Sequence, residues 1–216
     1  SSLSILLIFI PLIFIFLKNQ NYRHKKFKNS IKHLPNQKKW RTKDVIFDKK
    51  FYIYLPISIA TPFISTGLTF HQIFIITEKG WTIKMLANGF IFLGIFSILG
   101  LMFGGPIIDK YNTKKVVYFN LVPLFLGILI LNFFDHSFYI IIYMSFLGLS
   151  LGIGTPFIGA LWAELYGLES LGTVKAFLHA LMVFFSALSP VVFGYMIDMN
   201  LNIFSLSLLS ILIILF

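Results

Sequence analysis

The sequence predicts an all-α fold, a polytopic bundle of membrane-spanning helices. Of its 216 residues, 57% are hydrophobic and only 12% are charged, proportions far outside those of a soluble globular domain. Long apolar runs alternate with short polar turns along most of the chain. Because backbone amides inside hydrocarbon must be satisfied within their own segment, we expect these runs to be helices and not strands.

The apolar runs are close to the length of about 20 residues that a helix needs to cross a membrane. We expect spans at residues 1–17, 51–77, 83–108, 116–134, 138–163, 174–197 and 201–216. The first run starts without a methionine, and the last would place a carboxylate in the bilayer, which is costly. We therefore expect a fragment of a larger protein, with one partial span followed by six further spans.

The positive charge is concentrated in the predicted loop at residues 18–50. This loop holds twelve Lys and Arg residues and two acids, which account for the whole net charge of +10. Basic segments beside spans stay on the cytoplasmic side because their translocation is unfavourable. We therefore expect a cytoplasmic loop that sets the orientation and not a nucleic-acid-binding surface. Attraction to anionic lipid headgroups is an alternative role for the same charges.

A compact charged turn lies between the spans at 83–108 and 116–134. Its notable residues are Gly105, Asp109, Lys110, Asn112, Lys114 and Lys115. A glycine at the first position lets two helices approach closely. Asn112 tolerates a left-handed backbone better than most residues do. Alternation from the basic loop places this turn on the cytoplasmic side, where its three lysines outnumber its one acid.

This spacing resembles the signature turn of the major facilitator superfamily. That turn has Gly, three residues, Asp, Arg or Lys, one residue, Gly and then a basic pair, and it joins the second and third helices of each six-helix half. Asn112 replaces the family's second glycine, and Lys110 lacks the bidentate pairing of arginine. The stretches "FHQ" at 70–72, "AELYG" at 163–167 and "SPVVFGYMID" at 189–198 are also similar to bacterial members. An ordinary positive-inside turn is the alternative interpretation.

The resemblance implies the C-terminal six-helix half of a major facilitator-type transporter, residues 51–216. Residues 1–17 would then be the end of the sixth helix, and residues 18–50 the central cytoplasmic loop. The family's mechanism is secondary transport of a small solute by alternating access, as a symporter or antiporter, together with an N-terminal six-helix half. The charged turn would act as a latch that opens and closes as the two halves rock.

The same resemblance has implications for the transported solute and for the membrane in which the protein lies. The FHQ stretch is similar to monocarboxylate and oxalate/formate carriers and implies a small organic anion, with a proton gradient as one source of energy. The likeness to bacterial members implies the inner membrane of a bacterium. The alternative is a non-transporting membrane protein on the same helices, such as an assembly factor or a receptor.

A polar stripe follows the predicted span at 51–77. Its members are Ser58, Thr61, Ser65, Thr69 and Gln72. They fall within an arc of about 80° on a helix, and lipid does not favour such a stripe, so we expect it to face protein or a water-filled path. Hydrogen bonding between helices by small hydroxyls is the alternative. Pro62 and Gly67 favour a bend in the same segment.

Two histidines are further candidates for the substrate pathway. A histidine can exchange a proton near neutral pH, so His71 is a candidate for proton coupling. The alternative is a His71 side chain bonded to a neighbouring backbone carbonyl. His179 shares an arc with Lys175, Ser186 and Ser189, where it either lines the path or packs against a neighbour.

Small residues recur every three or four positions along the predicted span at 138–163. They are Ser145, Gly148, Gly152, Thr155 and Gly159. Such a face lets a neighbouring backbone come close, and lining of the path is the alternative. Glu164 lies at the expected cytoplasmic end of this helix, where it either pairs with the lysines of the charged turn or remains solvated.

The sequence contains no motif for catalysis or for a bound cofactor. It has no cysteine, no phosphate-binding loop, no His-Glu-x-x-His zinc motif and no nucleophile elbow. No pair of carboxylates falls on one buried face of a predicted helix. We therefore expect neither an enzyme nor a metal site nor ATP as the source of energy.

Overall fold

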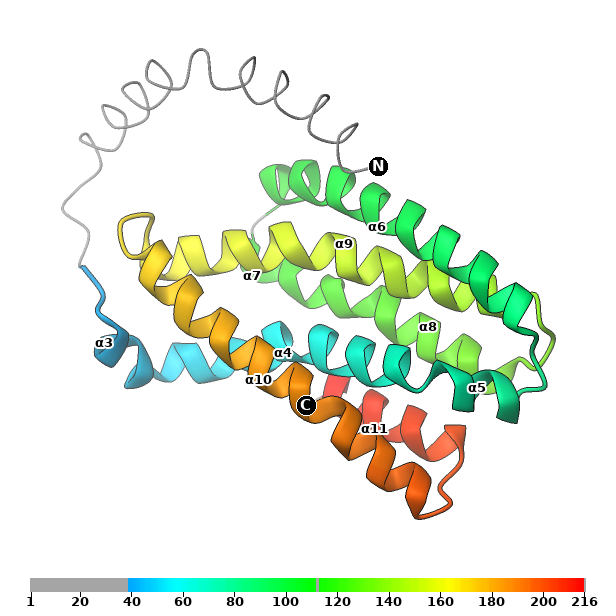
Figure 1. The fold of residues 1–216 in the computed structure, drawn as a ribbon. Coiled ribbons are helices and arrows are strands. Elements are labelled where there is room, and N and C mark those ends of the chain that lie inside the picture. Colours follow the sequence, from blue (N-terminus) through cyan, green and yellow to red (C-terminus); the bar gives the residue numbers. More distant parts are fainter. Residues whose placement is uncertain (1–38, 112, 216) are drawn as a thin grey trace, which may run out of the picture. The chain divides into compact units, whose positions relative to one another are not determined.

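A computed structural model describes residues 39–111 and 113–215, and its regular elements are helices (Figure 1). They are α3 (Thr42–Ile46), α4 (Lys49–Phe70), α5 (Gln72–Glu78), α6 (Ile83–Lys110), α7 (Thr113–Val116), the 3-10 helix η1 (Val117–Asn120), α8 (Leu121–Phe133), α9 (Tyr139–Tyr166), α10 (Leu171–Asp198) and α11 (Ile203–Leu215). Four of them, α4, α6, α9 and α10, are long and apolar enough to cross a membrane. The predicted all-α membrane bundle is therefore confirmed. The predicted span at 1–17 and the first part of the basic loop lie outside the described residues.

Most helix boundaries agree with the predicted spans to within a few residues. The turn between α9 and α10 is shorter than predicted, because α9 ends three residues later and α10 begins three residues earlier, so Glu164 is helical. α9 ends at Gly167, whose φ of 76° is accessible to glycine at little cost. The basic loop also ends earlier than predicted, because the Asp48 side chain accepts a hydrogen bond from Lys50 N and caps α4.

The predicted span at 51–77 divides into α4 and α5 at His71. α4 remains helical through Pro56 and Pro62, so the helix does not end at either proline. The main chain leaves the helical conformation at His71, where ψ is 25°. His71 N donates to the Gly67 carbonyl at 3.2 Å, and His71 Nδ1 lies 3.0 Å from the same oxygen. The side chain thus fixes the break to the last turn of α4.

α6 and α9 pack with their backbones in close approach, as the small residues of α9 predicted. A Cβ added at Gly152 would collide with Ser97 O, and one added at Gly148 would collide with the backbone of Leu93. From the other side, a Cβ at Gly100 would lie 2.7 Å from Leu149 O. Glycine is therefore required on both helices at this crossing.

The close approach predicted for Gly105 is not found among the described residues. A Cβ at Gly105 would meet no atom of the described residues within 4 Å, whereas a Cβ at Gly104 would lie 2.6 Å from Pro156 Cγ. One residue along a helix turns the side-chain direction by about 100°. Gly104 therefore faces α9, and Gly105 faces away from it.

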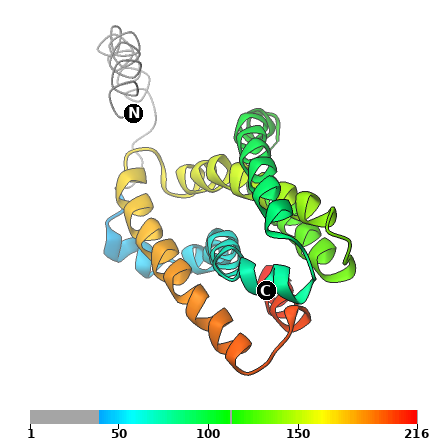
Figure 2. The same cartoon turned by 45° about the vertical axis from the view of Figure 1, so that its right-hand side comes forward.

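α10 packs mainly along α4, at the other side of the bundle from α6 (Figure 2). Ser189 Oγ donates to Phe63 O at 2.5 Å, and Thr66 Oγ1 lies 2.9 Å from Ser186 Oγ. These bonds satisfy polar groups that lipid would leave unpaired. The four long helices thus form two close pairs, α4 with α10 and α6 with α9, and fewer contacts join α4 to α9.

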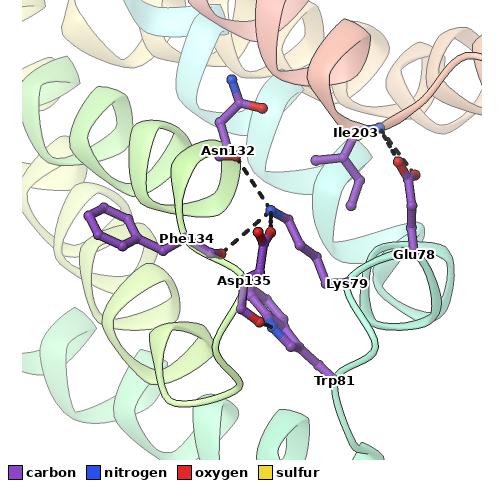
Figure 3. Close-up of polar contacts among 7 residues, drawn as sticks. All are labelled: Glu78, Lys79, Trp81, Asn132, Phe134, Asp135 and Ile203. Carbon is purple, nitrogen blue, oxygen red and sulfur yellow. Dashed lines mark hydrogen bonds and ion pairs between the residues drawn. The ribbon is translucent and has the colours of Figure 1, made fainter.

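The turns at one end of the bundle are held together by a group of polar contacts (Figure 3). Lys79 Nζ lies 2.6 Å from Asp135 Oδ1 and also donates to the carbonyls of Asn132 and Phe134, at 3.4 and 3.5 Å. Trp81 Nε1 donates to the Asp135 carbonyl. Glu78 accepts Ile203 N with both carboxylate oxygens at 3.1 Å, which caps the start of α11. The end of α5 and the turn after it are therefore tied to the end of α8 and the start of α11.

We expect Lys79→Met to lower the free energy of unfolding by about 1 kcal/mol, the net value of a typical hydrogen bond. The Lys79 side chain is only 10% exposed, and its hydrogen bond to Asn132 O near the end of α8 is partly buried. Lys84→Met, at an exposed position on α6, is the matched control and should have no such effect. Denaturation in mixed micelles, followed by circular dichroism, measures both. Equal stability of the two variants would contradict the assigned role of Lys79.

Candidate functional site

A cavity of about 640 Å³ lies between α4, α9 and α10. Thr61 contributes from α4, Gly159 and Trp162 from α9, and Gly172, Lys175 and His179 from α10. The space exists because α9 and α10 are joined by a short turn, while α10 then packs along α4. Glycines on the α9 wall leave room that larger side chains would fill.

Trp162 is a rigid part of the cavity wall. Its side chain is fully buried, and its Nε1 donates to Ser58 Oγ at 3.1 Å. The ring stacks on Tyr166 with centroids 5.8 Å apart and lies 5.1 Å from the ring of Phe51. These contacts belong to a second hydrophobic cluster beside α3, separate from the main core around α8 and α11. The indole is therefore held in one orientation from three sides.

The Lys175 side chain reaches the α9 wall of the cavity, and the residue is exposed. A Cβ at Gly159 would lie 3.4 Å from Lys175 Nζ. Gly159 lies seven residues before the end of α9, about 10 Å along the helix, whereas Lys175 lies only four residues after the start of α10. Lysines near helix ends usually extend toward the membrane surface. Lys175 does the opposite, and it forms no ion pair with any carboxylate whose side chain the structure describes.

Thr61 lies in the opposite wall with an unsatisfied hydroxyl. The residue is 3% exposed, and within the described part of the chain its Oγ1 has no hydrogen-bond partner. Its neighbours in the predicted stripe differ, since Ser58 Oγ donates to Tyr54 O and Ser65 Oγ donates to Pro62 O. A buried polar atom without a partner costs about 1–3 kcal/mol. The oxygen itself has almost no accessible surface, so it does not open onto the cavity.

The structure brings together several of the predicted pathway residues. Thr61 and His179 line the same cavity. Ser65 and Thr69 line a second cavity of about 530 Å³, and Leu151 contributes to both. The predicted stripe on α4 therefore follows two adjoining hollows from Thr61 to Thr69.

Gln72 and His71 do not line either of these two cavities. Gln72 is buried, and its Nε2 lies 3.7 Å from Met144 Sδ on α9. His71 is bonded to the Gly67 carbonyl, which is the alternative considered for it, and a Cβ at Gly194 would lie 3.3 Å from its Nε2. His71 and His179 therefore do not meet, and the described residues contain no group of three His, Asp or Glu side chains that could hold a metal ion.

The charged turn is shorter than predicted. Asp109 and Lys110 form the last turn of α6, and Lys114 and Lys115 belong to α7. Asn112 and the side chains of Asp109, Lys114 and Lys115 lie outside the described part of the structure. Lys110 Nζ lies 5.5 Å from the centre of the Tyr111 ring, and Glu164 is exposed on the last turn of α9. The pairing of Glu164 with the lysines and the latch role of the turn stay predictions.

The sequence did not lead us to name Lys175, Gly159 or Trp162 as pathway residues, although all three line the cavity. Lys175 entered only as a neighbour of His179, and Gly159 entered as a packing residue with lining of the path as the alternative. One signal was present, because Lys175 is the only Lys or Arg after Lys115. An isolated lysine within an apolar helix points to a functional role.

Comparison with known families gives one result. A sequence model described as Major Facilitator Superfamily matches residues 2–190. The matched region includes every residue that lines the cavity. No curated protein and no solved structure matches the chain.

Proposed function

This chain belongs to the major facilitator superfamily of membrane transporters, and from that premise we propose that it moves a small organic anion across the membrane by alternating access. The family match names the superfamily and no subtype, so it supports transport in general. The choice of an anion comes from the cavity and from the FHQ likeness in the sequence.

The observation that carries this proposal is a lysine that lines a cavity between apolar helices. Lys175 is exposed and its Nζ lies beside Gly159 at the cavity wall, and no carboxylate among the described residues lines the cavity. Ionisable side chains within membrane helices are costly and mark substrate or ion pathways. A solute with a negative charge would compensate this cation when it binds.

The helix pairing supports a moving pathway. The long helices form two close pairs, α4 with α10 and α6 with α9. The cavity lies where these pairs separate. We place a second six-helix half against the exposed polar side of this cavity, so that the site lies between two halves. Rocking of the halves would then open the site to each side in turn.

We propose that the protein lies in the inner membrane of a bacterium, with the basic loop and the 109–115 turn in the cytoplasm. The turn would hold the halves together in one state and release them in the other. For proton coupling we favour His179 over His71, because His179 lines the cavity and the His71 ring is bonded to a backbone carbonyl. A proton on His179 would add a second positive charge beside Lys175.

Uptake by the full-length protein in proteoliposomes tests this function. We expect saturable uptake of at least one small carboxylate from a panel that also holds neutral and cationic solutes. An imposed pH gradient should change the initial rate if a proton is coupled. Liposomes without protein are the control. A lack of stimulated flux for every solute would contradict the proposal and favour a non-transporting role such as an assembly factor or receptor.

A further inference from the structure

A groove with apolar walls lies between α4, α10 and α11. We propose that this apolar groove holds an acyl chain of an anionic phospholipid, whose headgroup binds beside Lys49 at the start of α4. The groove shares no lining residue with the cavity between α4, α9 and α10. The lipid site is therefore independent of which solute the protein transports.

The apolar groove has the size and chemistry of a site for a hydrocarbon chain. Its volume is about 550 Å³, and the described side chains that line it carry no polar atom. Pro56, Ile59 and Phe63 contribute from α4, Phe185 from α10 and Leu212 from α11. The groove opens to the surface of the bundle, since Leu212 is 57% exposed. Such walls offer nothing to a hydrophilic solute and favour an apolar chain.

A lysine and a tyrosine lie on the same face of α4 as the apolar groove. At 100° per residue, Lys49, Tyr52, Pro56, Ile59 and Phe63 fall within an arc of about 80°. Lys49 is the first residue of the helix and precedes Pro56 by seven residues, about 10 Å along the axis. Lys49 and Tyr52 are both exposed. A cation and a phenol thus lie at the end of a span, at the level of headgroups, and the groove follows at the level of acyl chains.

The positive charge of Lys49 is not neutralised by its neighbouring acid. Asp48 accepts hydrogen bonds from Lys50 N at 3.0 Å and from Tyr166 Oη at 3.1 Å. Lys49 forms no ion pair with any carboxylate whose side chain the structure describes. Phe47 is 85% exposed beside these charges, as expected for an aromatic ring that lies among headgroups. A lipid phosphate would supply the anion that Lys49 lacks.

Lipid retention by the full-length protein tests this site. Protein in detergent micelles is mixed with phosphatidylglycerol or with phosphatidylcholine, and bound lipids are counted by native mass spectrometry. We expect one phosphatidylglycerol to bind saturably, at least roughly fivefold more tightly than phosphatidylcholine, the value of one lysine at an anionic surface. Equal retention of the two lipids would indicate non-specific lipid contact and overturn the site.

Competition with glycerol 3-phosphate distinguishes a lipid from a free phosphate. This probe carries the phosphate without acyl chains, so it should not displace bound phosphatidylglycerol. Displacement would identify a site for soluble phosphates and overturn the lipid assignment.

Two adjacent lysines separate a defined site from general attraction to positive charge. Lys49 lies on the groove face of α4, whereas Lys50 lies on the face of the buried Ile57 and Leu68. Lys49→Gln should weaken phosphatidylglycerol binding by at least roughly fivefold. Lys50→Gln removes the same charge and should weaken it by less than about twofold. Equal losses in the two variants would indicate attraction to the whole charged surface and overturn the site.

Filling the apolar groove tests the placement of the acyl chain. Ile59→Trp adds bulk inside the groove and should weaken phosphatidylglycerol binding by at least roughly tenfold, the value of about two buried methylene groups. Ile91→Trp, at an exposed position on α6, is the matched control and should bind like the parent. Parental affinity in Ile59→Trp would overturn the placement. Should Ile59→Trp fail to fold by circular dichroism, the lysine pair still decides the proposal with an intact groove.

Discussion

Gly152→Ala is expected to lower the free energy of unfolding by about 3 kcal/mol, the upper end of the usual cost of overpacking. The added Cβ would collide with Ser97 O and would lie 2.9 Å from Leu101 N. Both are backbone atoms of α6 and cannot rotate away, so the whole helix must shift. Unfolding of the purified protein in mixed micelles, followed by circular dichroism, measures the change.

Gly94→Ala is the matched control on the same helix pair. A Cβ at Gly94 would meet nothing within 4 Å among the described residues. Alanine favours a helix over glycine by roughly 0.8–1 kcal/mol, so this variant should be as stable as the parent or slightly more stable. A similar loss in both variants would show that glycine acts through backbone flexibility and not through close approach of α6 and α9.

The membrane spans could be predicted because they depend on length and apolarity alone. A helix must cross a fixed thickness of hydrocarbon, and the polar turns at 78–82 and 135–137 mark where each crossing ends. The break at His71 could not be predicted in this way, because α4 absorbs two prolines without ending. Its position depends on contacts to the Gly67 carbonyl that exist only in the folded chain.

The start of the predicted span at 116–134 shows a similar limit. Its first turn is the 3-10 helix η1, which composition does not distinguish from an α-helix. Ser150 Oγ donates to Asn120 O at 3.2 Å, so a neighbouring helix satisfies a carbonyl at the end of η1. That bond joins residues thirty positions apart and has no local signal in the sequence.

The sequence predicted which residues could form the candidate site, but not which way their side chains point or which of them have partners. Thr61 and His179 were named from helical arcs, and the structure places both at one cavity. The stripe on α4 did not show which hydroxyl would lack a partner, because Ser58 is satisfied by Trp162 from another helix. Likewise, the contact of Lys175 Nζ with the α9 wall depends on the space at Gly159. Both features are tertiary and need the relative placement of helices.

Gly159→Leu is expected to reduce uptake of the transported solute to the level of liposomes without protein. Gly159 lines the cavity, and a Cβ there would lie 3.4 Å from Lys175 Nζ and 4.0 Å from Lys175 Cε. A leucine would therefore occupy the space in front of the ammonium group, where we place the solute carboxylate. Initial uptake rates in proteoliposomes, normalised to the amount of inserted protein, measure the effect.

The fold should tolerate this change, which separates it from Gly152→Ala. The atoms nearest a Cβ at Gly159 belong to the flexible end of a lysine side chain, which can move aside, whereas those at Gly152 are backbone. Gly94→Leu adds the same side chain where the described residues leave open space, so it should insert and transport like the parent. If Gly159→Leu transported at the rate of Gly94→Leu, the solute would have to cross outside this cavity. Loss of uptake in Gly159→Leu alone, with unfolding unchanged, would place the pathway between α9 and α10.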